Sequence, residues 1–207
     1  MIAIIDYGVG NLFSLQSSFG AIGEEAVITA DRTVMRQADR LILPGVGAFA
    51  DAAEKLRKSG LDSCLREEVS RGKPLMGICL GMQMLFEKSW EYGEHMGLGL
   101  LKGEIRPIAG KIGEGLKIPQ MGWNSLHIRQ QSPLLKYTQE GDYVYFVHSY
   151  SAEDCEDSLL ATTDYGAELT ACVGKGNVFG CQFHPEKSGK VGLRILKAFC
   201  ETEGAAC

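Results

Sequence analysis

Between residues 2 and 79 the sequence alternates short apolar runs with segments of helical periodicity. The runs predict buried strands and the segments between them predict amphipathic helices, an order typical of a parallel sheet covered by helices. We predict strands at Ile2–Ile5, Ala26–Thr29, Leu41–Leu43 and Pro74–Cys79. We predict helices from Asn11, a good capping residue, to Ile22, at Phe49–Lys58, at Leu61–Arg71 and directly after Cys79.

Beyond about Gly93 the segments become short and strand-like. We predict strands near 98–108, 117–128, 143–150, 159–163, 169–173 and 178–183, and a closing helix at 191–200. The turn Gly174-Lys175-Gly176-Asn177 indicates a hairpin. Because no linker or repeat interrupts the chain, we expect one domain over residues 1–207. The fold class is α/β, a mostly parallel central sheet flanked by helices with a smaller strand-rich second half.

Charge and cysteine usage exclude several classes of protein. The formal net charge of −5 argues against broad binding of nucleic acid or of an anionic membrane. The opening Met1–Asp6 fits a buried strand better than a signal peptide, and no apolar run approaches the roughly 18 residues that span a bilayer. The odd count of seven cysteines, without a C-x-x-C pair, favours reduced and mostly buried thiols in the cytoplasm. They are Cys64, Cys79, Cys155, Cys172, Cys181, Cys200 and Cys207.

The strongest local signal is Gly77-Ile78-Cys79-Leu80-Gly81, which follows an apolar strand and precedes a helical pattern. This is a nucleophile-elbow arrangement with cysteine as the nucleophile. Glycines two residues before and after remove Cβ atoms that would clash at so tight a turn. A sulfur at a helix N-terminus is favoured as thiolate, and the Leu80 amide is free to donate to an oxyanion. Taken alone, the motif also fits a buried cysteine between two glycines.

A second motif, His184-Pro185-Glu186, follows a strand pattern 105 residues downstream of Cys79. In an extended segment His184 and Glu186 face the same way. His184 can exchange a proton with the thiol and the leaving amine, while Glu186 orients the imidazole. In isolation these residues also fit a turn and a solvated charge; with the elbow they predict a Cys79–His184–Glu186 triad.

Other candidate sites are weaker. Tyr7-Gly8-Val9-Gly10 lacks the third glycine of a dinucleotide loop, because Phe13 holds its place. His95 and His127 have no ligand partners nearby in sequence. We therefore expect no cofactor and no metal, and we expect Cys181 to point away from the triad.

Together, Gly77–Gln83 and His184–Glu186 resemble the class I (triad) glutamine amidotransferases over the whole chain. Four further stretches are similar to the HisH branch of that family: residues 5–12, 43–49, 119–124 and 146–150. The resemblance implies a flavodoxin-like fold and hydrolysis of glutamine through a cysteinyl thioester. The ammonia would pass to a HisF-type (β/α)₈ barrel in a heterodimer, which forms imidazole glycerol phosphate and AICAR in histidine biosynthesis.

The resemblance also assigns residues to roles. The substrate pocket is expected from Gly47, Gln83, Glu91, His148, Ser149 and Tyr150. Trp123 and Asn124 are expected on the partner-facing side. In the loop Pro44–Gly47, which by composition is equally a strand-ending turn, the Val46 amide is expected to serve as an oxyanion donor only after a peptide flip. Two alternatives stay open: the glutaminase subunit of anthranilate or aminodeoxychorismate synthase, and a catalytically silent regulatory subunit.

Overall fold

The computed structural model describes residues 1–113 and 115–204 and is built on an eight-stranded sheet. Its strands follow the order β2 (Ala26–Thr29), β1 (Ile2–Ile5), β3 (Arg40–Leu43), β4 (Leu75–Ile78), β14 (Val178–Cys181), β13 (Glu168–Lys175), β12 (Leu159–Asp164) and β9 (His127–Ile128). The first five strands are parallel to one another, whereas β13, β12 and β9 each run antiparallel to the strand before them in this order. The parallel part has the 2-1-3-4-5 order of flavodoxin-like folds, as expected.

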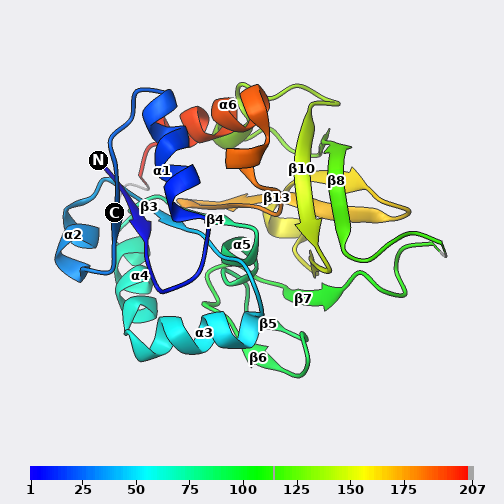
Figure 1. Cartoon of the computed structure of the whole chain (residues 1–207), viewed down its shortest axis with the longest axis horizontal. Helices are drawn as coiled ribbons and strands as arrows, with labels where there is room; N and C mark the ends of the chain where they lie inside the picture. The colour runs from blue at the N-terminus through cyan, green and yellow to red at the C-terminus, as the bar shows by residue number, and fades with distance from the viewer. Residues whose placement is uncertain (114, 205–207) are drawn as a thin grey trace.

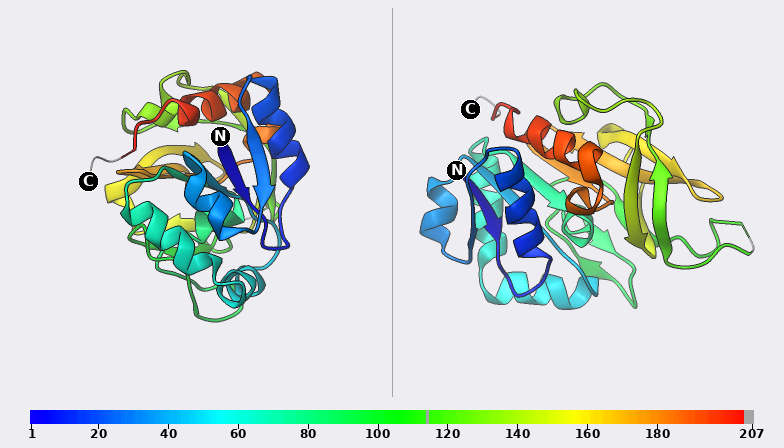
Figure 2. Two further views of the ribbon diagram at one scale, coloured as in Figure 1. Left: turned by 90° about the vertical axis from the view of Figure 1, so that its left-hand side faces the viewer. Right: turned by 45° about the horizontal axis from the view of Figure 1, so that its top comes forward.

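Helices cover both faces of this sheet (Figures 1 and 2). One face carries α1 (Leu12–Ala21) and α6 (Gly189–Cys200), and the other α2 (Arg32–Gln37), α3 (Phe49–Lys58) and α4 (Leu61–Ser70). Side chains of β1 alternate between the two layers: Ile4 packs on the side of α1 and α6, Ile5 on the side of α3 and α4. Both are fully buried, which is why the strand is apolar throughout.

The second half adds two small sheets. One pairs β8 (Gln120–Ser125) with β10 (Tyr143–His148), at the end of the molecule opposite α2 (Figure 1). The other has the order β11 (Tyr150–Glu153), β7 (Glu104–Pro107), β5 (Lys88–Ser89) and β6 (His95–Met96). Short 3₁₀ helices η1 (Pro133–Leu135) and η2 (Glu156–Ser158) lie between strands, and η3 (Pro185–Lys187) lies between β14 and α6.

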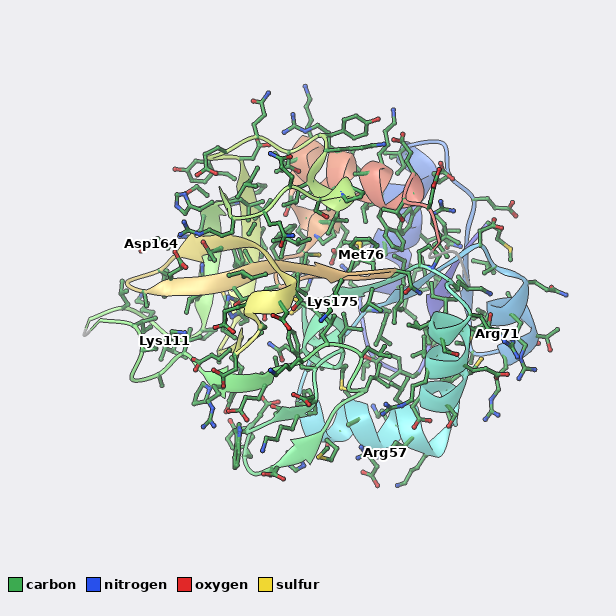
Figure 3. The ribbon with its side chains drawn as sticks, turned by 180° about the vertical axis from the view of Figure 1, so that it is seen from behind. Arg57, Arg71, Met76, Lys111, Asp164 and Lys175 are labelled. Carbon is green, nitrogen blue, oxygen red and sulfur yellow. The ribbon has the colours of Figure 1, made fainter. Side chains whose placement is uncertain are left out.

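Seen from behind, Met76 of β4 lies in the middle of the fold, while Arg57 of α3 and Arg71 beyond α4 lie at its edge (Figure 3). Met76 is fully buried and β4 is a central strand, so the residues that follow β4 begin at the middle of the sheet. Within the described ranges, no helix combines the length and apolar character needed to cross a membrane.

The expected strands and helices of the first half are present, and the hairpin at 174–177 is confirmed by pairing of Lys175 with Val178. Several details differ. The side chain of Asn11 makes no capping hydrogen bond. Helix α2 was not predicted, and the predicted strand 98–108 is a strand only at β7.

The helix after Cys79 is also shorter than its pattern suggests: α5 spans only Leu80–Gln83. The carbonyls of Met84 and Leu85 accept hydrogen bonds from the N–H groups of Leu98 and Leu100, at 2.7 and 2.8 Å. Tertiary partners thus take the acceptors that a longer helix would use, which ends α5 after one turn.

Candidate active site

Cys79 lies at the sharp turn between β4 and α5, with φ +54° and ψ −112°. This is a sparsely populated conformation for a residue with a Cβ atom, and such strain is found mainly at functional sites. The backbone N–H of Cys79 donates to the carbonyl of Cys181 at 2.8 Å, which ties the turn to β14. Cys79 is 7% exposed, so little of the nucleophile is open to solvent.

Glycines make this turn possible, as expected. A Cβ on Gly77 would lie 2.5 Å from the carbonyl oxygen of Gly81, and a Cβ on Gly81 would collide with the carbonyl of Leu43. A Cβ on Gly45 would lie 2.8 Å from the amide nitrogen of Gly81. The elbow is therefore a contact of backbone against backbone that no larger residue fits.

His184 and Glu186 pair with each other as predicted, but not through an extended segment: His184 precedes the 3₁₀ helix η3, and the turn of that helix brings Glu186 to the imidazole. His184 Nδ1 lies 2.9 Å from Glu186 Oε1, and the two side chains are 3% and 1% exposed. Since a carboxylate only accepts, Nδ1 carries the proton, and the neutral ring presents the lone pair of Nε2. Nε2 is buried, and no hydrogen-bond partner for it occurs among the described residues. The backbone N–H of His184 donates to the carbonyl of Tyr145 at 2.9 Å, which fixes the imidazole relative to β10.

The electrostatics join this imidazole to the sulfur. Burial alone lowers the basicity of His184, but its interactions with Cys79 and Glu186 outweigh that cost and raise its pKa to about 9. The protonated imidazole is thus stabilised by an acidic partner on each side. A basic imidazole beside a cysteine is the arrangement that nucleophilic catalysis by a thiol requires.

Cys79 and His184 open into one cavity of about 490 Å³. Every residue predicted for substrate or oxyanion binding lines it: Val46, Gly47, Leu80, Gln83, Glu91, His148, Ser149 and Tyr150. Sequence reasoning missed the rest of its wall: Tyr92, Pro107, Ala109, Ile118, Pro119 and Val147. Only Tyr92 carried a sequence signal, because it precedes Gly93 and glycine is typical of turns; in the structure its φ is +54°.

Two of these residues also hold the protein's own backbone. A carboxylate oxygen of Glu91 accepts from the N–H of Phe49, the first residue of α3, at 2.5 Å. The side-chain Nε2 of Gln83 donates to the carbonyl of Tyr150 at 3.2 Å. These hydrogen bonds fix the positions from which Glu91 and Gln83 reach the pocket. Phe49, the residue that Glu91 binds, lies two residues beyond the Pro44–Gly47 loop that carries Val46.

His148 is held as a neutral imidazole. Its Nδ1 donates to the carbonyl of Tyr150 at 2.8 Å. Burial, reinforced by the neighbouring His184, lowers the pKa of His148 to about 4 despite that hydrogen bond. At neutral pH its Nε2 is a bare acceptor with no hydrogen-bond partner among the described residues.

Trp123 and Asn124 lie on β8 outside the cavity. Trp123 is 53% exposed and stacks edge to face against Tyr145 of β10. The side chain of Asn124 instead donates to the carbonyl of Asp164 at 3.0 Å and accepts from Gln120, so it braces the strand. Met121 and Tyr143 are exposed on the same face as Trp123.

Besides Cys79, the described residues hold five cysteines, all of them free: Cys64, Cys155, Cys172 and Cys181 are buried and Cys200 is half-buried. Cys207 lies outside the described residues. Burial raises the pKa of Cys155 and of Cys172, and it raises the pKa of Cys200 to about 12. Cys181 is fully buried and its pKa is also raised by burial. These four thiols stay protonated and unreactive.

The family model described as "Glutamine amidotransferase class-I" matches residues 3–202. Imidazole glycerol phosphate synthase subunit HisH of Oceanobacillus iheyensis is 51% identical over 202 residues, which cover 97% of this chain and 98% of the relative. The protein of the same name from Lactococcus lactis subsp. lactis is 54% identical over 201 residues, with 97% and 98% covered.

Solved structures agree on the fold. "Crystal structure of glutamine amidotransferase" aligns with a TM-score of 0.76 at 20% identity, covering 97% of this chain and 98% of that one. "Structure of PurLQS from Thermotoga maritima" has a TM-score of 0.76 at 22% identity, covering 96% of each chain. The chain therefore belongs to the class I glutamine amidotransferase family and, within it, to the HisH subunits of imidazole glycerol phosphate synthase.

Proposed function

We propose that this chain hydrolyses L-glutamine to L-glutamate and ammonia at Cys79 and passes the ammonia to a HisF-type (β/α)₈ barrel. There the ammonia serves formation of imidazole glycerol phosphate and AICAR. The observation that carries the proposal is the shared cavity. A strained elbow sulfur and the imidazole of a buried His184–Glu186 pair line the same space of about 490 Å³.

In the acylation step the Cys79 thiolate attacks the side-chain carbonyl carbon of glutamine. The backbone N–H of Leu80, at the start of α5, supports the negative oxygen that forms. The C–N bond then breaks while the His184 imidazolium gives its proton to the leaving nitrogen, releasing ammonia. Glu186 holds the imidazole and stabilises its charged form. The product is a γ-glutamyl thioester on Cys79.

Hydrolysis reverses the roles. Neutral His184 takes a proton from a water molecule, whose oxygen attacks the thioester carbon. The C–S bond breaks, glutamate leaves, and the thiolate and imidazolium are restored. Glu91 supplies a carboxylate for the α-ammonium group of glutamine, and Gln83 an amide for its polar groups.

The Pro44–Gly47 loop is the proposed point of control. Gly45 packs tightly on the elbow, but Val46 lines the cavity and is 44% exposed, and Gly47 has φ +94° with open space around its Cα, so the second half of the loop packs loosely. We expect a flip that aims the Val46 amide at the oxyanion only when the partner and its substrate are bound. One missing oxyanion donor costs about 100- to 1,000-fold in rate. Full turnover by the isolated chain would contradict this control.

The outer face of β8 and β10 is the proposed docking surface for the barrel. Met121, Trp123 and Tyr143 expose 62%, 53% and 58% of their surface there. Carbonyls of β10 also touch the active site, since Tyr145 accepts from His184 and Val147 lies 3.9 Å from Cys79 Sγ. An exposed apolar face that borders the catalytic centre suits a partner receiving ammonia directly.

Ammonia release with and without a HisF-type barrel tests the proposal. We expect strong stimulation by the barrel and complete loss in Cys79→Ser. A glutamine-analogue electrophile should label Cys79 in the complex; absence of labelling would favour a silent regulatory subunit. Stimulation by an anthranilate or aminodeoxychorismate synthase instead of the barrel would reassign the pathway while keeping the chemistry.

A further inference from the structure

Gln182 is a fully buried polar residue between β14 and His184 that does not line the glutamine cavity. Its backbone N–H donates to the carbonyl of Ala171 at 2.9 Å, which fixes its position on the sheet. Its side chain points toward the elbow, where Nε2 lies 3.8 Å from Cys79 Sγ. A buried amide beside the sulfur requires an explanation, because its two polar ends must each find a partner.

The hydrogen-bond chain determines which end of that amide faces the sulfur. The carbonyl of Tyr150 can only accept, so the group of Gln83 that lies 3.2 Å from it is the NH₂. The same NH₂ group lies 3.1 Å from Gln182, which must therefore present its oxygen there. The remaining end of Gln182, its own NH₂ group, faces Cys79 Sγ. A backbone carbonyl thus orients two amides in series, with a donor at the sulfur.

A donor at this point discriminates between the two forms of the nucleophile. A further contact of Sγ besides His184, the carbonyl of Val147 at 3.9 Å, accepts a hydrogen bond from the thiol and repels the thiolate. Gln182 acts in the opposite direction, since an N–H group binds an anionic sulfur more strongly than a neutral one. With little water in reach of the buried amide, this contact has no ready substitute.

We propose that Gln182 is a thiolate-stabilising residue of the nucleophile, oriented through Gln83 by the Tyr150 carbonyl. The inference rests on the proposed function, because a stabilised thiolate has a use only if Cys79 is the nucleophile. The property that it describes is the reactivity of the Cys79 sulfur and not the turnover of glutamine. The same hydrogen bonds connect Tyr150, the first residue of β11, through Gln83 and Gln182 to Cys79 Sγ. The position of this strand therefore affects the reactivity of the nucleophile.

The test is alkylation of Cys79 by iodoacetamide in the assembled complex without glutamine, followed on the Cys79 peptide by mass spectrometry. Iodoacetamide reacts with thiolate, so the rate reports that form. Gln182→Met keeps the side-chain length and removes the donor. We expect its rate at neutral pH to fall about 10-fold or more, with the pH–rate profile moved to higher pH.

Gln182→Glu replaces the donor by an acceptor of the same shape and should slow alkylation further. It also serves if Gln182→Met fails to fold, which thermal melting reveals. Thr163→Val is the matched control, because Thr163 is equally buried, does not line the cavity, and donates its hydroxyl to the carbonyl of Ser125 in β8. A folded Gln182→Met or Gln182→Glu with the native alkylation profile would overturn the inference. Because no glutamine is present, this outcome is distinct from an absence of glutaminase activity.

Discussion

The carboxylate of Glu91 accepts a hydrogen bond from the N–H of Phe49 at 2.5 Å, so one side chain joins the glutamine pocket to the first turn of α3. The Pro44–Gly47 loop ends just before that turn. A carboxylate at a helix N-terminus is stabilised by the unpaired N–H groups and the helix dipole. We therefore propose two tasks for Glu91: recognition of the substrate ammonium group and retention of the helix that follows the Pro44–Gly47 loop.

Substitutions at Glu91 should separate these tasks. Glu91→Gln keeps an oxygen for Phe49 but loses the charge, so we expect KM for glutamine to rise about 10- to 100-fold with little change in Tm. Glu91→Ala should raise KM similarly and also lower stability by about 1 kcal/mol. Steady-state kinetics in the complex and thermal melting measure both. An unchanged KM in Glu91→Gln would refute the ammonium role.

Gly81→Ala should be among the most damaging small substitutions in the chain. Its new Cβ collides with the carbonyl of Leu43, a backbone atom that cannot rotate away. We expect a loss of more than about 2 kcal/mol in chemical denaturation, together with loss of Cys79 labelling. Gly20→Ala is the control, since Gly20 lies in α1 with open space around its Cα; it should be neutral or stabilising by up to about 1 kcal/mol.

Stability should depend on pH through His184. Its pKa is raised from 6.5 to about 9, so between these values the folded protein binds a proton that the unfolded chain has lost. The stabilisation is fully present below pH 6.5 and disappears as the pH rises through about 9, a change of about 3 kcal/mol. Denaturation of the native chain and of His184→Asn across this range measures it. The two curves should converge at high pH; a constant gap would contradict the assignment.

Truncation of Trp123 tests the docking surface. Large aromatic side chains at the centre of an interface commonly contribute about 2 kcal/mol or more to binding. We expect Trp123→Ala to weaken binding of a HisF-type barrel about 30-fold, measured by titration calorimetry, while the isolated chain keeps its Tm. Met96→Ala is the matched control: Met96 is 58% exposed on β6, away from β8 and β10 (Figure 1). Equal effects of the two variants would argue against this face.

Much of this architecture could be predicted from the sequence because its strongest signals are local. Continuous apolar runs such as Ile2–Ile5 identify strands buried on both faces, and the glycines around Cys79 identify the elbow. The elements that were not predicted are short. Helix α2 is a six-residue segment too short for periodicity, and β5 and β6 have two residues each. Their formation depends on neighbours that the sequence does not reveal.

Within the site, sequence motifs predicted the residues that project into the pocket but not those that orient them. Gln182 is adjacent to the His184 motif, yet its relation to Cys79 depends on the pairing of β4 with β14 and on the amide of Gln83. Similarly, nothing in the sequence relates Glu91 to Phe49. Such relations arise only when distant segments pack together.

The glycine contacts at the elbow have a consequence for how such a protein can change. Gly45, Gly77 and Gly81 press on one another's main chains or on that of Leu43, so replacing any one displaces the others. Substitutions at these glycines therefore cannot move the Cys79 sulfur by small steps, because each of them disrupts the turn. New acyl-donor preferences must instead be acquired in the surrounding walls, for example at Tyr92 or Ala109, while the elbow is inherited intact.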